Sequence, residues 1–160
     1  VIYSESRFKP QGTSPVGARG LMQLMPQTAA GIARRTGEAN FSIDKLYDPA
    51  LNVKFGTYHL QGLMGRYDSD IGPAIVAYNG GGGAGDRYQD GGREGLVPRE
   101  SLTYVKRVLE AKAKYEELYP ARLASGQALQ AFLEPNTAPE PPFNTLLRAV
   151  QNAVANRINQ

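Results

Sequence analysis

The chain has 160 residues, 41% of them hydrophobic, with 18 basic and 15 acidic side chains and a formal net charge of +3. This length suits one compact domain of about 100 to 150 residues with a segment left over. Because the basic residues are spread along the sequence, we expect no nucleic-acid partner. The absence of cysteine excludes disulfides, thiolate metal sites and cysteine nucleophiles, and the single histidine argues against a zinc site, so we expect neither a metal nor a cofactor.

The beginning of the sequence carries no recognisable targeting signal. No apolar run approaches the roughly 18 residues of a membrane-spanning helix, and no charged segment followed by an apolar one indicates a signal peptide. Val1 is not an initiator methionine and lies in a segment of helical character, so we expect further residues upstream of it, and this end of the sequence does not determine targeting.

Helix signals dominate the first part of the chain. A helix is predicted over residues 1–7, followed by a loop over 10–20, where "PQGTSPVGARG" has the chemistry of turns. A second helix is predicted over 21–36, with Pro26 tolerated in its early turns and Gly37 as its C-terminal stop.

The strongest start signal follows: Asp48 is a good N-cap and Pro49 suits the first helical position. The apolar face predicted for this helix comprises Leu51, Val53, Leu60, Leu63, Met64 and Tyr67. The apolar segment 71–79, "IGPAIVAYN", is compatible with a buried helix or a strand, and the glycine-rich segment after it is predicted to be mostly loop.

A long helix is predicted from Arg99 to Tyr119, ended by Pro120, with an inner face of Leu102, Val105, Val108 and Leu109. Beyond it, residues 135–142 contain four prolines, which is typical of an extended linker. We therefore predict three parts: a main domain over 1–119, a helix and proline-rich linker over 120–142, and an amphipathic helical segment over 143–160.

Two motifs favour ordinary structural roles. The glycines at 80, 82 and 85 formally match a dinucleotide fingerprint, but such a fingerprint opens a helix and is followed by an acidic residue about 20 positions on. Here the run leads into "DRYQDGG", so a surface loop or cleft-edge loop is favoured. His59 lacks the nucleophile and orienting acid of a triad, and a partly buried structural histidine is favoured.

Glu5 is the one acid before Glu38, and it lies near the predicted end of a helix. The negative end of the helix dipole, together with burial, would raise its pKa, as a general acid requires. Glycoside hydrolysis ordinarily uses paired carboxylates, although a substrate with a 2-acetamido group can supply its own nucleophile. The formal partners for Glu5 are Asp44, Asp48, Asp86, Asp90 and Glu94.

Five ordered segments cover roughly residues 1–110: "ESRFKP" (5–10), "SPVGARGLMQLMPQTA" (14–29), "DPALNVKFGTYHL" (48–60), "AYNGG" (77–81) and "RESLTYVKRVL" (99–109). In order and spacing they resemble the soluble lytic transglycosylase family. The resemblance implies a mainly α, lysozyme-like domain with a cleft for peptidoglycan strands, to which this chain adds a C-terminal helical extension.

The resemblance implies that Glu5, which matches the glutamate of the family's Glu-Ser pair, is the sole catalytic acid and base. Glu5 would protonate the glycosidic oxygen between N-acetylmuramic acid and N-acetylglucosamine. It would then take the proton from the C6 hydroxyl as that oxygen closes on C1, which gives a 1,6-anhydromuramyl end. The positions that match the family's substrate-binding residues are Ser14, Met22, Gln23, Tyr78, Asn79 and Tyr104.

For both tyrosines the alternative role is core packing with an incidental hydroxyl contact. For Glu5 the alternative is an ordinary exposed glutamate. The chain has Ala-Tyr-Asn-Gly-Gly where the family usually has Ala-Tyr-Asn-Ala-Gly, and "RESLTYV" replaces the more frequent Glu-Thr-Arg-x-Tyr-Val. We expect these departures, which lie at the rim, to affect subsite preference rather than the chemistry.

Two other functions stay open: a goose-type lysozyme, which would need a second, water-activating carboxylate, and a non-catalytic wall-binding or virion structural module. The expected partners are peptidoglycan strands and, through residues 143–160, another protein or further parts of a larger chain. Membrane contact is not expected, since Arg148 and Arg157 are the only cations of that segment. The expected setting is the periplasm of the cell envelope, or a phage virion protein delivered into the periplasm during genome ejection.

Overall fold

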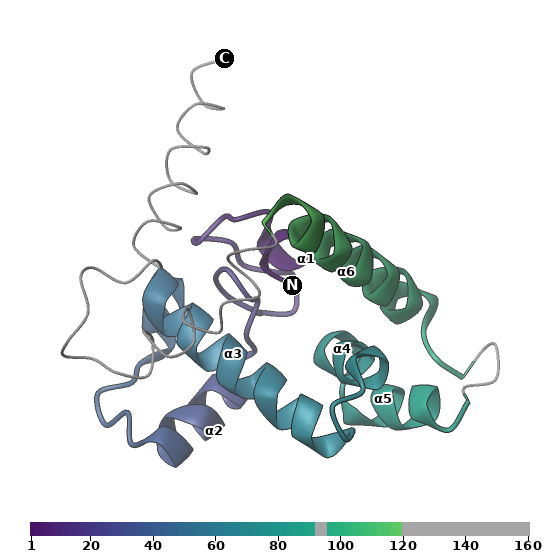
Figure 1. The fold of residues 1–160 in the computed structure, drawn as a ribbon. Helices are drawn as coiled ribbons and strands as arrows, with labels where there is room; N and C mark the ends of the chain where they lie inside the picture. The colour runs from purple at the N-terminus through teal and green to yellow at the C-terminus, as the bar shows by residue number, and fades with distance from the viewer. Residues whose placement is uncertain (92–95, 120–160) are drawn as a thin grey trace, which may run out of the picture. The chain divides into compact units, whose positions relative to one another are not determined.

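The computed structural model describes residues 1–91 and 96–119 (Figure 1). The chain divides into two compact units, Val1–Glu110 and Ala111–Gln160, and each is considered by itself. The predicted linker and amphipathic segment, 120–142 and 143–160, lie outside the described residues. The first unit contains the helices α1 (Ile2–Ser6), α2 (Pro26–Thr36), η1 (Ile43–Tyr47), α3 (Pro49–Arg66), α4 (Ile71–Gly80) and α5 (Gly82–Gln89), and the beginning of α6 (Arg99–Leu118).

The described residues are mainly α-helical, as predicted, and α4 settles the ambiguity of residues 71–79 in favour of a helix. Outside the helices, the isolated antiparallel bridges Thr13–Arg19 and Arg19–Leu24 hold the segment between α1 and α2 together. In residues 1–91 and 96–119, no helix combines the length and apolar character that crossing a membrane requires.

Helix starts follow the predicted capping chemistry at α3 and α4. The Asp48 carboxylate accepts a hydrogen bond from the Leu51 N–H at 2.7 Å, with Pro49 in the first helical position. The Asp70 carboxylate likewise accepts from the Gly72 N–H at 2.9 Å. Both starts are therefore fixed by side chains that precede the helices.

The predicted start of the second helix at Leu21 is wrong. The helix α2 begins at Pro26, with Met25 as its extended N-cap, and Leu24 forms the bridge to Arg19 instead. Pro26 cannot donate a backbone hydrogen bond, and the first helical position is where that donor is not needed. The predicted end holds, since Gly37 adopts a left-handed conformation with φ of 70°.

The glycine-rich segment, predicted to be mostly loop, contains the helix α5 (Gly82–Gln89). It is stabilised by packing on α4. An added Cβ at Gly85 would lie 2.3 Å from the Tyr67 hydroxyl and 2.7 Å from the Ala77 Cβ, so the two helices approach closely because this residue lacks a side chain. Tertiary contact outweighs the low helix propensity of glycine here.

Three clusters of buried side chains form the core of the first unit. One joins α2, η1 and α3, a second joins α4, α5 and α6, and a small one surrounds Tyr67. On α6 the predicted inner residues Val105 and Val108 are buried, whereas Leu102 is 38% exposed. Ser101 and Tyr104, which were not predicted for this face, are also buried. A polar residue and a tyrosine thus occupy the inner face of this helix.

Candidate active site

Glu5 lies in the five-residue helix α1. The helix ends because Arg7 and Phe8 both adopt left-handed backbone conformations, with φ of 50° and 62°. This conformation is uncommon for residues other than glycine, so two in succession fix a sharp turn directly after the acid. The side chain of Glu5 is half-buried.

Tyr104 of α6 contacts Glu5 from 99 positions away in the sequence. Its hydroxyl donates a hydrogen bond to Oε1 of Glu5 at 2.5 Å. The position of α1 beside α6 in Figure 1 agrees with this contact. A hydrogen bond of this length to a carboxylate is a strong one, and it fixes the orientation of the carboxyl group.

Burial raises the pKa of Glu5 above its usual value, and the Tyr104 hydrogen bond and the positive charge of the amino terminus oppose this only in part. Burial and the Glu5 charge also raise the pKa of Tyr104 and of Tyr78. Both phenols are therefore protonated donors at neutral pH. A carboxyl group with a raised pKa, close to neutral donors, suits general acid catalysis.

Tyr78 of α4 connects the acid to the loop before α2. Its hydroxyl donates to the Met22 carbonyl oxygen at 2.9 Å, and its pKa responds to the Glu5 charge. On its other side, the ring of His59 lies 5.3 Å from the Tyr78 ring, centroid to centroid. Tyr78 is thus held between α3 and the loop, near Glu5.

Gln23 adopts a left-handed conformation with φ of 48°. Its side-chain nitrogen donates to the carbonyl oxygens of Gly12 at 3.1 Å and Gly20 at 2.8 Å. The amide nitrogen therefore stabilises its own loop, and the hydrogen bonds of Gln23 found in the described part of the chain leave its amide oxygen unused. Ser14 likewise acts within the loop, where its hydroxyl oxygen accepts from the Ala18 N–H at 3.0 Å.

Met22 is only 4% exposed. Its sulfur would lie 2.2 Å from a Cβ built on Gly56, so the side chain packs directly on the backbone of α3. The accessible methionine of this segment is Met25, which is 42% exposed. Asn79 is half-buried, and its side-chain oxygen accepts a hydrogen bond from the Ser101 hydroxyl at 2.9 Å, which joins α4 to α6.

Asn52, which the sequence analysis missed, is fully buried and anchors the loop to α3. Its side-chain oxygen accepts from the Met22 N–H at 2.7 Å, and its nitrogen donates to the carbonyl oxygens of Arg19 at 2.9 Å and Leu46 at 2.8 Å. A signal was present in the sequence, since a polar residue interrupts the apolar face of a well-capped helix.

Most of the formal carboxylate partners of Glu5 are engaged elsewhere. Asp44 pairs with Arg19 at 2.9 Å, and Asp48 caps α3. Asp86 pairs with Arg66 at 2.8 Å and accepts from the Tyr67 hydroxyl at 2.9 Å. Asp90 follows the last residue of α5, and Glu94 lies outside the described residues. No carboxylate is among the groups that shift the pKa of Glu5 in the described part of the chain.

Within residues 1–91 and 96–119, no three His, Asp or Glu side chains gather in a way that could hold a metal ion. His59 has no serine nucleophile or carboxylate as a described hydrogen-bond partner, and burial followed by the charge of Arg35 lowers its pKa. The described residues therefore form a helical domain whose candidate site is centred on one half-buried glutamic acid, oriented by a tyrosine.

The chain belongs to the Transglycosylase SLT domain family, whose family model matches residues 1–95. It is 40% identical over 81 residues to the transglycosylase of Enterobacteria phage PRD1, an alignment that covers 51% of this chain and 27% of that protein. It is 34% identical over 125 residues to the soluble lytic murein transglycosylase of Escherichia coli K12, which covers 72% of this chain and 19% of that protein.

Among solved structures, the chain is similar to the 70 kDa soluble lytic transglycosylase SLT70 of Escherichia coli. The TM-score is 0.65 with 32% sequence identity, and the match covers 74% of this chain and 21% of that one. These findings confirm both the family and the mainly α, lysozyme-like fold predicted from the sequence. The chain spans only about a fifth to a quarter of the length of these relatives.

Proposed function

We propose that this domain is a lytic transglycosylase that cleaves the β-1,4 bond between N-acetylmuramic acid and N-acetylglucosamine in peptidoglycan. Family membership and the printed names of the relatives support the activity and the substrate class. The observation that carries the proposal is the 2.5 Å hydrogen bond from Tyr104 to Glu5, a half-buried acid whose pKa is raised by burial.

Glu5 in its protonated form donates its proton to the glycosidic oxygen, and the bond from that oxygen to C1 of the muramic acid breaks. The 2-acetamido group stabilises the developing positive charge at C1. The Glu5 carboxylate then accepts the proton of the C6 hydroxyl while the C6 oxygen bonds to C1. The acid is regenerated, no water is consumed, and the product carries a 1,6-anhydro ring.

A single acid and base agrees with the surroundings of Glu5. An inverting hydrolase needs a second carboxylate about 6.5 to 9.5 Å away, and a retaining one needs it at about 5 to 5.5 Å. A like charge that close would be a cause of the raised pKa of Glu5, yet among residues 1–91 and 96–119 the causes are burial, opposed by Tyr104 and the amino terminus. This observation favours the lyase over a goose-type lysozyme.

The other predicted residues divide by their contacts. Tyr104 orients Glu5, and Tyr78 keeps the Met22 carbonyl close to the acid through its 2.9 Å hydrogen bond. We assign Gln23 to substrate contact through its amide oxygen, because the loop already uses its nitrogen. The remaining predicted residues contribute to substrate binding indirectly, because they pack and hydrogen-bond within the walls of the site. These residues are Ser14, Met22 and Asn79.

The setting that fits this activity is the periplasm, where the peptidoglycan lies. A virion protein that opens the wall during genome ejection would act in the same place, and the similarity to the PRD1 transglycosylase supports that origin. The further partner proposed for residues 143–160 is another protein or another part of a larger chain.

The experiment is mass spectrometry of the muropeptides that the protein releases from purified peptidoglycan, compared with the Glu5→Gln variant. The expected products are lighter than hydrolysis products by one water, about 18 Da, and are absent with the variant. Glutamine keeps the shape of the side chain and cannot exchange the proton, so the comparison isolates the acid and base role.

Reducing-end products from the wild-type protein would overturn the lyase mechanism and identify a lysozyme-like hydrolase. Equal release of anhydro products by Glu5→Gln would refute the role of Glu5. No release by either protein, with both folded by circular dichroism, would favour a wall-binding or virion structural module.

A further inference from the structure

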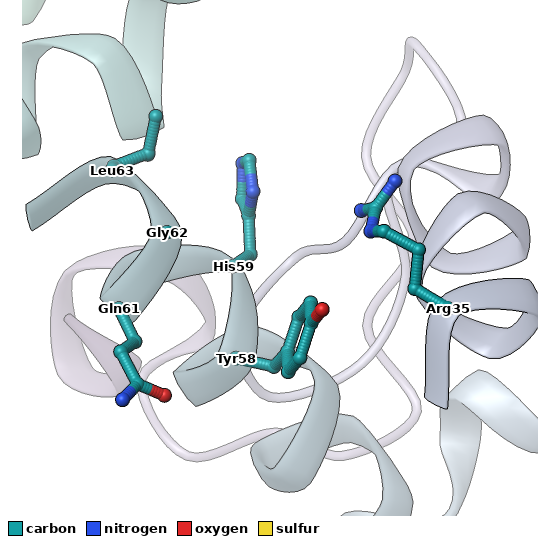
Figure 2. A pocket seen from close by; sticks show the side chains of 6 residues that line it. All are labelled: Arg35, Tyr58, His59, Gln61, Gly62 and Leu63. Carbon is teal, nitrogen blue, oxygen red and sulfur yellow. The ribbon is translucent and has the colours of Figure 1, made fainter. Parts of the chain in front are cut away.

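A depression of about 430 Å³ lies against α3. It is lined by Arg35, Tyr58, His59, Gln61, Gly62 and Leu63. Figure 2 shows that Arg35 comes from one helix and Tyr58 and His59 from another, with these three side chains turned toward a common space and Gln61 turned away. The depression therefore combines a cation, a phenol and an imidazole contributed by α2 and α3.

The cation of this depression is not neutralised by a described acid. The guanidinium of Arg35 lies over the Tyr58 ring, 5.9 Å from its centroid. The ion pairs found in residues 1–91 and 96–119 use other cations, namely Arg19, Lys54, Arg66, Lys106, Lys112 and Lys114. A guanidinium stacked on an aromatic ring keeps its N–H edge available for a planar anion such as a carboxylate.

His59 joins the depression to the site of Glu5. Its ring lies 5.3 Å from that of Tyr78, whose hydroxyl binds the Met22 carbonyl and whose pKa responds to the Glu5 charge. The charge of Arg35, in addition to burial, lowers the pKa of His59, so the imidazole is neutral at pH 7 and offers an N–H donor. The packing of His59 on Tyr78 is therefore the contact that joins the depression to the candidate site.

We propose that the depression binds a carboxylate of the stem peptides of peptidoglycan, with Arg35 as its counter-ion and Tyr58 and His59 as flanking contacts. The inference rests on the proposed function for its choice of ligand. In peptidoglycan the lactyl groups of the muramic acids are joined to the stem peptides as amides, so the sugars are neutral and the negative charge is carried by the stem peptides. A cation without an ion-pair partner among the described residues therefore matches the stems rather than the glycan.

The first test is NMR titration of the full chain with a soluble stem peptide. His59 is the only histidine of the sequence, so its ring signals report on the depression without overlap from other imidazoles. The titration is done at about pH 8, where His59 is neutral in every variant. We expect the ring signals to shift with the peptide and not with the same peptide in which all carboxyl groups are amidated.

The variant is Arg35→Ala, and the matched control is Arg34→Ala, since both arginines are exposed and are neighbours on α2, while Arg34 lines a different depression. We expect Arg35→Ala to weaken binding of the peptide about tenfold and Arg34→Ala to leave it unchanged. Absence of a shift at His59, equal shifts with the amidated peptide, or equal losses in the two variants would overturn the proposal.

Turnover separates this inference from the proposed function. With intact peptidoglycan, Arg35→Ala should raise KM about tenfold with kcat nearly unchanged, and with peptidoglycan whose stem carboxyl groups have been amidated it should have no effect. If the wild-type protein cleaves neither substrate, the proposed function fails, while the NMR titration still decides whether the depression binds the stem. Equal effects of Arg35→Ala on both substrates would refute recognition of the stem.

Discussion

Replacing Asn52 by alanine tests the anchor that places the loop beside the acid. The variant removes a fully buried amide that binds the Met22 N–H and the carbonyl oxygens of Arg19 and Leu46. The Arg19 oxygen keeps a second partner, because it also accepts from the Leu24 N–H at 3.0 Å. Two backbone groups, those of Met22 and Leu46, lose the partner that Asn52 provides.

The expected cost follows from these two groups. A buried polar group left without a partner costs about 1 to 3 kcal/mol, so the two groups together should lower the free energy of unfolding of Asn52→Ala by about 2 to 6 kcal/mol. For a unit of this size, 1 kcal/mol corresponds to roughly 4 to 8 °C in Tm, so we expect a fall of about 8 °C or more. This is a large share of the roughly 5 to 15 kcal/mol that stabilises a typical domain.

The assay is urea unfolding followed by circular dichroism, with muropeptide release measured at a temperature where the variant is folded. The matched control is Asn40→Ala, which truncates the same residue type at an exposed position. We expect the control to stay within about 0.5 kcal/mol of the wild-type protein. If the two variants unfold within about 1 kcal/mol of each other, the buried amide is not the anchor that we infer.

Two further predictions concern Glu5. Tyr104→Phe removes the hydrogen bond that lowers the pKa of Glu5, so the pKa of Glu5 should rise further. The alkaline limb of the pH profile of kcat/KM should then move to higher pH, and the maximum of kcat/KM should fall about tenfold. An alkaline limb that does not move would contradict the contact between Tyr104 and Glu5. A carboxyl group with a raised pKa in the folded state contributes stability at low pH that is lost as pH rises through that pKa. Glu5→Gln should therefore raise Tm at about pH 8 and leave it unchanged at about pH 3.5. Thermal unfolding of both proteins at the two pH values tests this.

The helices were predictable where local chemistry decides them. Asp48 and Pro49 at the start of α3, and Gly37 at the end of α2, act through contacts with residues near them in the sequence, and the structure has both boundaries as predicted. The helix α5 was missed because its stability comes from close packing of Gly85 on α4, which no local pattern records. The start of α2 was misplaced because apolar residues before Pro26 continue the helical pattern while forming a bridge.

The candidate site was predictable only in part, for the same reason. The ordered motifs predicted Glu5, Tyr78 and Tyr104, and the structure brings these three close together. They did not predict how each is held, since the Tyr104 contact spans 99 positions and the role of Asn52 depends on three backbone groups from separate segments. Similarly, Arg35 and His59 lie on different helices, and only the fold shows that they line one depression.

The Tyr104 contact also defines how much of the chain the chemistry requires. The family model matches residues 1–95, yet Tyr104, which orients Glu5, lies beyond that range, on α6. The same helix contributes Val105 and Val108 to the core cluster shared with α4 and α5. Burial of that cluster positions the Tyr104 hydroxyl against Glu5, and we therefore expect the packing of α6 on α4 and α5 to be required for the orientation of the acid. We therefore predict that the smallest domain with the proposed activity extends at least through Val108.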